Sequence, residues 1–307
     1  MQPGPFQMGS PEDDDEALPG KRPPHPVRIT RAFKMARHEV TFAEYDRFAY
    51  ATGARPPSDS GFGEGLSPEE RARLPAINVS FDEPRAYAKW LSREIGKRFR
   101  LPTEAEWEYA VRVGTTHRRF WGDEPSQACT YANVFDTRNE AALRAMYGAN
   151  ITWEPHRCPD PYPYTAPVGS FQANPWGLHD LLGNVFEWVE DRWHKDYTGA
   201  HEDGSTPWLE AGDGDCGRRV VRGGSWSGPA RLVRSAHRGG VTPGDRDLTL
   251  GFRLVQSTRG GLLPMARSRT LRGVAGCGAR VSMSPLPGLA GTAAPNSPAR
   301  AGKRRGW

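Results

Sequence analysis

The chain contains no run of about 18 consecutive apolar residues, the minimum length that a membrane-spanning helix requires. Its first residues, MQPGPFQMGS, contain neither the charged start nor the apolar stretch of a secretion signal. We therefore expect no membrane span and, by default, a cytoplasmic protein.

Cysteine is scarce and follows no metal-binding pattern. The 307 residues include four cysteines, Cys129, Cys158, Cys216 and Cys277, without a CxxC pair or a zinc-like spacing to histidine. The eight histidines likewise lack HxH or HExxH spacing. These absences exclude a structural zinc motif and do not indicate a disulfide framework. The sequence does not decide whether Cys129 pairs with Cys158.

Aliphatic residues are also few. Hydrophobic residues make up 37% of the chain, beside 35 glycines and 28 prolines, which favours many loops around a limited core over a helical bundle. Ten tryptophans, nine tyrosines and twelve phenylalanines supply the missing core volume.

Acidic residues are absent from residues 257–307. This segment carries eight arginines and one lysine, so it contributes +9 to the net charge of +5 and residues 1–256 contribute −4. A mildly acidic body is not expected to bind nucleic acid. The tail is rich in Gly, Pro, Ala and Ser, and we expect it to be disordered. It either binds an acidic partner or has no function.

Three capping boxes predict three helices in the first half of the chain. They are Thr41–Glu44, Ser80–Glu83 and Thr103–Glu106, in each of which a hydroxyl and a glutamate satisfy the first backbone amides of a helix. Apolar residues at helical spacing extend these helices to the glycines at positions 53, 96 and 114. The glutamates of the third helix, Glu104, Glu106 and Glu108, are interpreted as cap and dipole groups.

After residue 114 the helical period ends. Short apolar runs alternate with turns, which indicates short strands and ordered loops without βαβ units. The segments 55–74 and 196–215 are rich in Gly, Pro and acidic residues, so we expect surface loops there. GDGDCG at 212–217 matches GxGxxG, but no strand is expected before it and no helix after it, so it predicts no phosphate site. The chain is predicted to be one α+β domain, residues 1–256, with a tail at 257–307.

The motifs then resemble a known family. FQMGS, HEVTFAEYDRFAYATG, PAINVSFDEPRAYAKWL, FRLPTEAEWEYAVRVG, YANVF, TAPVGSFQANPWGLHDLLGNVFEWVEDRW, RVVRGGSW, RSAHR and GFRLV occur in the order typical of the formylglycine-generating enzymes, the sulfatase-modifying factor domain. The resemblance covers about residues 6–255. It implies a C-type-lectin-like fold with small antiparallel sheets, few helices and much ordered loop. It also places Met1 at the edge of the domain, which leaves room for an upstream segment.

The resemblance implies a chemistry whose ligands this chain lacks. Members of the family oxidise a sulfatase cysteine to formylglycine with copper and oxygen, and two cysteines after the RGGSW turn hold the copper, since soft thiolates suit Cu(I). The corresponding positions here are Gly228 and Val233 counted from the turn, or Ala230 for the second counted back from RSAHR. No cysteine lies between Trp226 and Arg238. We therefore do not expect copper. An iron-dependent branch of the family uses an HxxxHxE pattern, which is also missing.

Four residues of the same stretch remain candidates for lining a cleft. Ser225 matches a serine of the family's active-site cleft, and the others are Arg222, Trp226 and Arg238. Ser225 has no base or metal beside it in the sequence, so its interpretation as a turn residue is favoured. A different catalytic use of the cleft around Ser225, Arg222 and Arg238 stays open.

Calcium is the cofactor that the residues support. In DLLGNVFEW, Asp180 and Glu187 flank a bend at Gly183 and Asn184, and a hard cation needs such carboxylate and carbonyl oxygens. The resemblance implies two sites. The first comprises Asn133, the Val134 carbonyl, Asp160 and the Tyr162 carbonyl. The second comprises the side chains of Asp180 and Glu187 and the carbonyls of Gly183 and Val185.

These observations predict a calcium-stabilised binding or scaffold module for a peptide or protein. The alternative is a formylglycine-generating oxidase with unusual ligands. The sequence indicates no oligomeric state.

Overall fold

The computed structural model describes residues 1–12, 14–17, 20–59, 61, 65–148, 151–210 and 217–258. The predicted disordered tail lies outside the described residues, except for Ser257 and Thr258. Within the described part of the chain, no helix is both long enough and apolar enough to cross a membrane.

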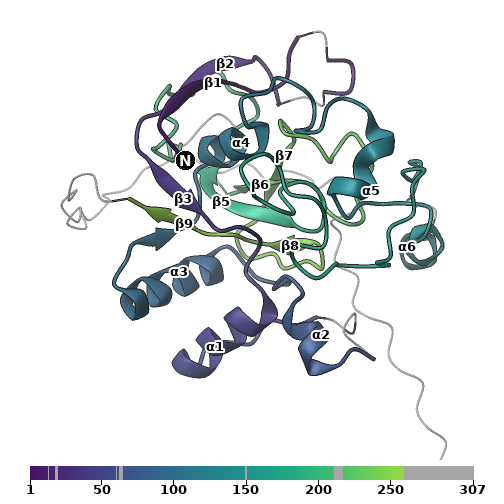
Figure 1. The fold of residues 1–307 in the computed structure, drawn as a ribbon. Coiled ribbons are helices and arrows are strands. Elements are labelled where there is room, and N and C mark those ends of the chain that lie inside the picture. Colours follow the sequence, from purple (N-terminus) through teal and green to yellow (C-terminus); the bar gives the residue numbers. More distant parts are fainter. Residues whose placement is uncertain are drawn as a thin grey trace, which may run out of the picture.

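Three small sheets form the framework (Figure 1). The first pairs β1 (Gly4–Met8) with β2 (His25–Ile29), and the second has the order β3-β9-β4, from Phe33–Met35, Val255–Ser257 and Phe99–Arg100. The third has the order β7-β6-β5-β8, from Arg238–Val241, Arg219–Arg222, Phe186–Arg192 and Leu250–Gly251. The expectation of antiparallel sheets is correct for every pair except β5 and β8, which run parallel.

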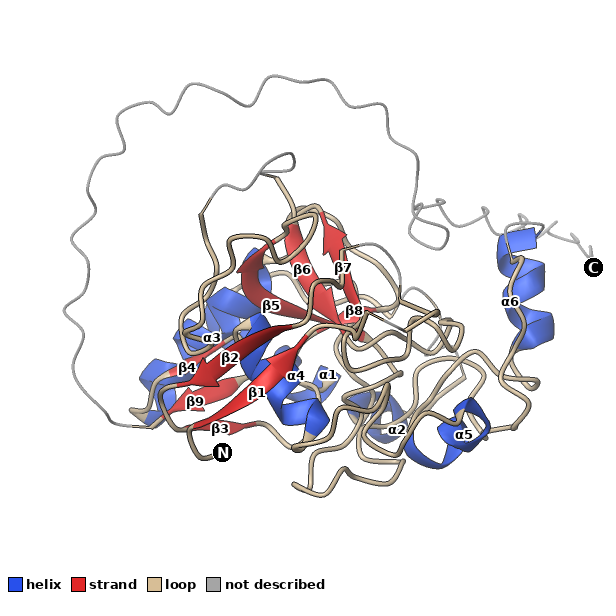
Figure 2. Cartoon of the chain, turned by 90° about the horizontal axis from the view of Figure 1, so that it is seen from above, coloured by secondary structure: helices blue, strands red, loops and turns tan. Residues whose placement is uncertain are grey.

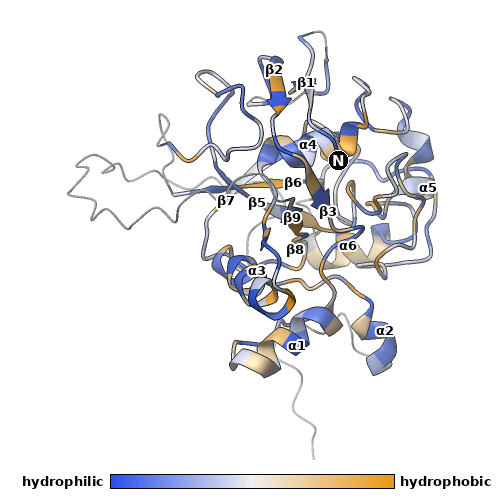
Figure 3. Cartoon of the chain, turned by 60° about the vertical axis from the view of Figure 1, so that its left-hand side comes forward, coloured by the Kyte–Doolittle hydropathy of each residue, from blue (hydrophilic) through white to orange (hydrophobic). Residues whose placement is uncertain are grey.

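The helices lie around these sheets, and long loops connect them. They are α1 (Phe42–Thr52), α2 (Pro68–Ala72), α3 (Asp82–Ile95), α4 (Glu104–Arg112), the 3-10 helix η1 (Pro125–Gln127), α5 (Ala128–Tyr131) and α6 (Glu140–Tyr147). Figure 2 shows the strands gathered at the centre and α6 standing apart from them. Figure 3 colours most of α3 hydrophilic, in keeping with a helix at the outside of the fold.

The capping boxes at Thr41 and Thr103 are confirmed, since in each the hydroxyl and the glutamate both make their expected bonds. Only one of the two hydrogen bonds predicted for the capping box at Ser80 is present. The Glu83 carboxylate accepts from the Ser80 amide at 2.8 Å, but α3 begins after Phe81 and the Glu83 amide bonds to the Ser80 carbonyl instead of its hydroxyl. A further box, Ser67–Glu70, begins α2 in a segment that was expected to be loop.

Both faces of the four-stranded sheet are buried. On one face, Trp188 and Val221 join a cluster with residues of α1 and α3, including Tyr45 and Tyr87. On the other face, the neighbouring strand residues pack against α4, around Trp107. Successive side chains of a strand point to opposite faces, so the central strands β5 and β6 connect the two clusters. Helix α4 and strand β6 are therefore held rigidly against each other.

Candidate functional site

Residues 219–238 form strand β6, a turn, a loop and the start of strand β7. The turn glycines, Gly223 and Gly224, have φ angles of 101° and 79°. A Cβ atom would lie 2.8 Å from the Leu181 carbonyl oxygen at the first position and 2.9 Å from the Leu232 carbonyl oxygen at the second. The turn therefore requires glycine at both positions, for its conformation and for its space.

The two arginines predicted to line a cleft are buried ion-pair partners of helix α4. Arg238 donates from Nε and Nη2 to the two carboxylate oxygens of Glu104, each at 2.7 Å. Arg222 pairs with Glu108 and donates to the His237 carbonyl oxygen at 2.6 Å. Both guanidinium groups are at most 1% exposed. Their hydrogen bonds join β6, β7 and α4 in the interior, where charge-assisted bidentate pairs are strongest.

The other two cleft candidates are also buried. The Ser225 hydroxyl lies 3.1 Å from the Ser227 hydroxyl, and in the described part of the chain it makes no hydrogen bond to a basic group. Trp226 packs edge-on against Tyr164 with ring centroids 5.5 Å apart. The structure thus gathers the four cleft candidates in the interior, with no solvent-facing wall made by them.

The residues at the positions that correspond to copper ligands are tightly packed in the loop. Val233 is fully buried against the α4 side of the core, and a Cβ atom on Gly228 would lie 3.1 Å from the Ser225 carbonyl oxygen. The guanidinium group of Arg119 holds the loop by donating to the carbonyl oxygens of Val233 at 3.0 Å and Ala230 at 2.8 Å.

Two of the four cysteines are joined to each other. Cys129 and Cys158 form a disulfide, a pairing that the sequence left open. Cys216 and Cys277 lie outside the described residues.

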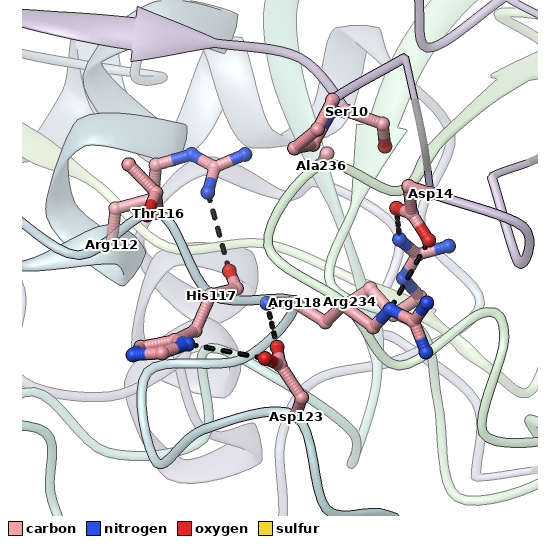
Figure 4. Close-up of a pocket in the computed structure, with 10 residues that line it drawn as sticks. Ser10, Asp14, Arg112, Thr116, His117, Arg118, Asp123, Arg234 and Ala236 are labelled. Carbon is pink, nitrogen blue, oxygen red and sulfur yellow. Dashed lines mark hydrogen bonds and ion pairs between the residues drawn. The ribbon is translucent and has the colours of Figure 1, made fainter.

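A pocket of about 390 Å³ opens beside the end of the same loop (Figure 4). Three segments that are distant in sequence line it: Ser10, Pro11 and Asp14; Arg112, Thr116, His117, Arg118 and Asp123; and Arg234 and Ala236. The pocket includes none of the four cleft candidates.

Charge dominates the lining of this pocket. The Asp14 carboxylate pairs with Arg118 at 3.1 Å and also with Arg234, as Figure 4 shows. Two buried hydrogen-bond donors, the Ser10 hydroxyl and Arg234 Nε, have no partner among the residues that the structure describes. Burial lowers the pKa of Arg234 to about 10, but the group stays cationic at neutral pH. No pattern in the sequence predicts this pocket, because its walls come from the end of α4 and from loops that are distant in sequence.

The second predicted calcium site lies at a bend with left-handed backbone. Asp180 and Asn184 have φ angles of 56° and 53°, and Gly183 between them has 78°. A Cβ atom on Gly183 would lie 2.2 Å from the Asn133 carbonyl oxygen, so only glycine fits. Asp180 Oδ2 accepts the Gly169 amide at 2.6 Å, whereas the buried Oδ1 has no partner within the described part of the chain.

Glu187, the other predicted side-chain ligand, already has a cation. Its carboxylate accepts Arg253 Nε at 2.8 and 2.7 Å and the Trp107 indole at 2.9 Å, and it is fully buried. The sequence analysis did not predict Glu39. Its Oε1 accepts from Asn184 at 3.1 Å, and its buried Oε2 has no partner in the described residues. The unpartnered oxygens at this site are therefore on Asp180 and Glu39.

The carboxylates of the second site are destabilised as anions. Burial raises the pKa of Glu39 well above its ordinary value, and the charge of Asp180 adds to the rise. Burial also raises the pKa of Asp180 and of Glu187, although Arg253 opposes the rise at Glu187. Three buried carboxylates thus share one guanidinium group. A hard divalent cation beside Asp180 and Glu39 would favour their ionised forms, so these two residues fit the predicted ion, whereas Glu187 is already neutralised by Arg253.

The first predicted site also has buried oxygens without partners. Asn133 is fully buried and its Nδ2 donates to the Tyr164 carbonyl at 2.7 Å. Asp160 Oδ1 accepts the Tyr162 amide at 2.7 Å. Neither Asn133 Oδ1 nor Asp160 Oδ2 has a partner among the described residues. Burial, with Asp136 nearby, raises the pKa of Asp160 to about 7. These oxygens again suit a hard cation.

Comparison with known proteins places these observations in a family. The model of the sulfatase-modifying factor enzyme 1-like domain matches residues 1–258. The chain is 32% identical over 239 residues to the formylglycine-generating enzyme of Mycobacterium tuberculosis, covering 61% of this chain and 71% of that protein. It is 30% identical to the formylglycine-generating enzyme of Streptomyces coelicolor, with coverage of 81% and 86%. The solved structure of PvdO from Pseudomonas aeruginosa is 32% identical, with a TM-score of 0.67 and coverage of 83% and 92%.

Proposed function

The chain belongs to the sulfatase-modifying factor enzyme 1-like domain family, and from this premise we propose that it is a calcium-stabilised binding or scaffold module for a peptide or protein. The resemblance of its motifs to formylglycine-generating enzymes and its α+β fold are confirmed. Family membership alone does not distinguish a scaffold from an oxidase, because function depends on the site and not on the fold.

The observation that carries the proposal is the packed loop after the RGGSW turn. A copper site of the family's kind needs thiolates there, but the loop presents Gly228 and a fully buried Val233, and Arg119 fixes its backbone. The two cysteines in the described residues are joined in a disulfide, which leaves their sulfur atoms unable to bind as thiolates.

Buried oxygens support the calcium part of the proposal. Among the described residues, the first predicted site contains two buried oxygens without protein partners, on Asn133 and Asp160. The second predicted site contains one, on Asp180, and Glu39, which the sequence did not predict, adds another. An unpaired buried polar atom costs free energy, so an ion that coordinates it would stabilise the folded state.

The polar pocket supports the binding part. Three arginines, Arg112, Arg118 and Arg234, line it against two aspartates, and the volume of about 390 Å³ suits a side chain and part of a backbone. A peptide with a carboxylate side chain would complement this excess of positive charge. Glutamate-containing peptides should therefore bind more tightly than matched lysine peptides in fluorescence anisotropy, and Arg118→Ala, at the partly exposed arginine of the lining, should reduce the difference. Equal binding of both peptides would rule out this pocket as the peptide site.

Metal titrations test the proposal as a whole. Melting temperature should rise with calcium in the native protein, and Asp180→Ala should remove most of that rise. An unchanged rise in this variant would refute the assignment of the second site. Cu(I) should not bind tightly at one equivalent to the C129S/C158S variant, in which the disulfide thiols are removed. Tight one-to-one binding would favour the alternative function, a formylglycine-generating oxidase. The similarity to the two named formylglycine-generating enzymes is the reason to consider this alternative.

A further inference from the structure

The loop between β1 and β2 places three consecutive carboxylates against the arginines of the pocket. We call these residues, Asp14–Glu16, the acidic segment. Each of the three nitrogen atoms of the Arg118 guanidinium group pairs with a different carboxylate of the segment, at 3.1, 2.6 and 2.9 Å in chain order. Asp14 also pairs with Arg234, and Figure 4 shows both of its ion pairs at one edge of the pocket. The chain's own carboxylates therefore occupy two of the cations that an acidic peptide would use.

The backbone of the acidic segment is bonded within its own loop. The Ala17 amide donates to the Asp14 carbonyl oxygen at 3.1 Å, and Arg22 Nη2 donates to the same oxygen at 2.5 Å. The loop is closed at its base, where the Ser10 amide donates to the Lys21 carbonyl oxygen at 2.8 Å. The paired residues of β1 and β2 lie beyond this base. The segment can therefore lift away from the pocket without breaking a hydrogen bond of the sheet.

The three carboxylates contribute unequally to this contact. The side chains of Asp14 and Arg234 are each 4% exposed, whereas those of Asp15 and Glu16 are 83% and 34% exposed. Exposed ion pairs contribute little, so the buried pair of Asp14 is the main contact. Breaking a buried pair without a substitute leaves an uncompensated charge. A peptide carboxylate that replaces Asp14 forms the same kind of pair with Arg234, so the exchange leaves no buried charge unpaired.

We propose that the partner of this pocket is a peptide with a cluster of acidic side chains, and that the acidic segment is its internal competitor. The proposal rests on the proposed function, because it concerns the same pocket. A segment tethered beside its site has a high effective concentration there, so a single free carboxylate displaces it poorly and several together displace it better. The apparent affinity for the peptide is lowered in proportion to the fraction of molecules in which the pocket is open.

Neutralising the acidic segment tests the proposal. The triple variant D14N/D15N/E16Q keeps the shape of the three side chains and removes their charge. In fluorescence anisotropy, a labelled peptide with three consecutive glutamates should bind this variant at least about 10-fold more tightly than it binds the wild type. Adding R118A to the triple variant should remove most of the gain, because the peptide contacts the released arginine. The double variant D15N/E16Q retains the buried Asp14 and should show a smaller gain, with circular dichroism as the check that each variant is folded.

A second triple variant controls for the change in net charge. It neutralises three exposed acidic residues of α2 and α3, and it is E69Q/D82N/E94Q. Figure 1 shows these helices at the opposite end of the molecule from β1 and β2. Remote exposed charges are screened by salt, so this control should change the peptide affinity less than about 3-fold. An equal gain in both triple variants would overturn the proposal.

Hydrogen exchange of the wild-type protein gives a readout that needs no substitution. A saturating concentration of the triglutamate peptide should speed exchange at residues 14–17, because the displaced segment loses its local bonds. Unchanged or slower exchange there, or equal affinity of the wild type and the triple variant D14N/D15N/E16Q, would overturn the internal competitor and leave the pocket as a peptide site. Binding of the peptide to neither protein would overturn this proposal and the role of the pocket in the proposed function together.

Discussion

The ion pair between Arg238 and Glu104 allows a test of whether Arg238 supports the fold or lines a cleft. Both side chains are nearly inaccessible, and two hydrogen bonds of 2.7 Å join them. Glu104→Ala leaves the Arg238 guanidinium buried without its carboxylate. Removing one partner of a buried pair costs about 3–5 kcal/mol. For a domain of this size, each kcal/mol lowers the melting temperature by roughly 2–4 °C, so a fall of roughly 6–20 °C is expected.

Urea denaturation of wild type, Glu104→Ala, Arg238→Met and the double variant measures this cost. The double variant should recover much of the loss, because it leaves no uncompensated buried charge, and the cycle should give a coupling of at least about 1.5 kcal/mol. Glu140→Ala is the matched control, since its pair with Arg144 is partly exposed on both sides and should contribute less than about 1 kcal/mol. A cost below about 1 kcal/mol for Glu104→Ala would refute the structural role and return Arg238 to the list of cleft residues.

Three further outcomes follow from single features of the fold. Burial lowers the pKa of Lys21 from 10.5 to about 7, so between these pH values the unfolded chain binds one more proton than the folded chain. From pH 7 to pH 10, the free energy of unfolding of the wild type should therefore rise by on the order of 2–4 kcal/mol relative to Lys21→Met, measured by urea titrations at both pH values. Parallel pH profiles of the two proteins would count against this shift. Gly183→Ala places a Cβ atom 2.2 Å from the Asn133 carbonyl oxygen at a φ of 78°, so thermal melts should show a loss of more than about 3 kcal/mol in the free energy of unfolding. A loss below about 1 kcal/mol would contradict the close approach. Replacing both Cys129 and Cys158 by serine opens a loop between residues 29 apart in sequence, and urea denaturation should show a loss of about 3 kcal/mol in the free energy of unfolding. An unchanged midpoint would mean that the disulfide does not constrain the unfolded chain.

Local signals in the sequence predicted local structure well. The helix starts at Thr41 and Thr103 and the stop at Gly53 depend on residues within one turn of each other, and all three are as expected. The box at Ser80 failed because α3 begins one residue later than a cap at Ser80 requires, and the Glu83 carboxylate is also held by Arg246 from a distant loop. Tertiary contacts thus overrode the local preference.

The candidate site was predictable only where a continuous motif carried it. The bend at Gly183 was visible in the sequence because its special backbone lies within one motif. The burial of Arg222 and Arg238 was not, because Glu108 and Glu104 lie 114 and 134 residues away in sequence. The glutamates of α4 were interpreted as cap and dipole groups, which holds for Glu106, but two of them are also the partners of buried arginines.

Two elements of the site had no signal in the sequence at all. Glu39 reaches the second predicted calcium site through its contact with Asn184, 145 residues further along the chain. The pocket beside Arg234 is closed by Ser10 and Asp14 from the N-terminal loop. Both depend on how separate loops pack, and a single sequence carries no pattern for such packing.

The most direct test of the account is turnover of a sulfatase-type cysteine peptide by the native protein with copper and oxygen, followed by mass spectrometry. The loop after the RGGSW turn lacks thiols and is packed, so the peptide should keep its cysteine and form no aldehyde above the level of a protein-free control. Aldehyde formation that requires copper and scales with protein concentration would contradict the account and make this chain an oxidase.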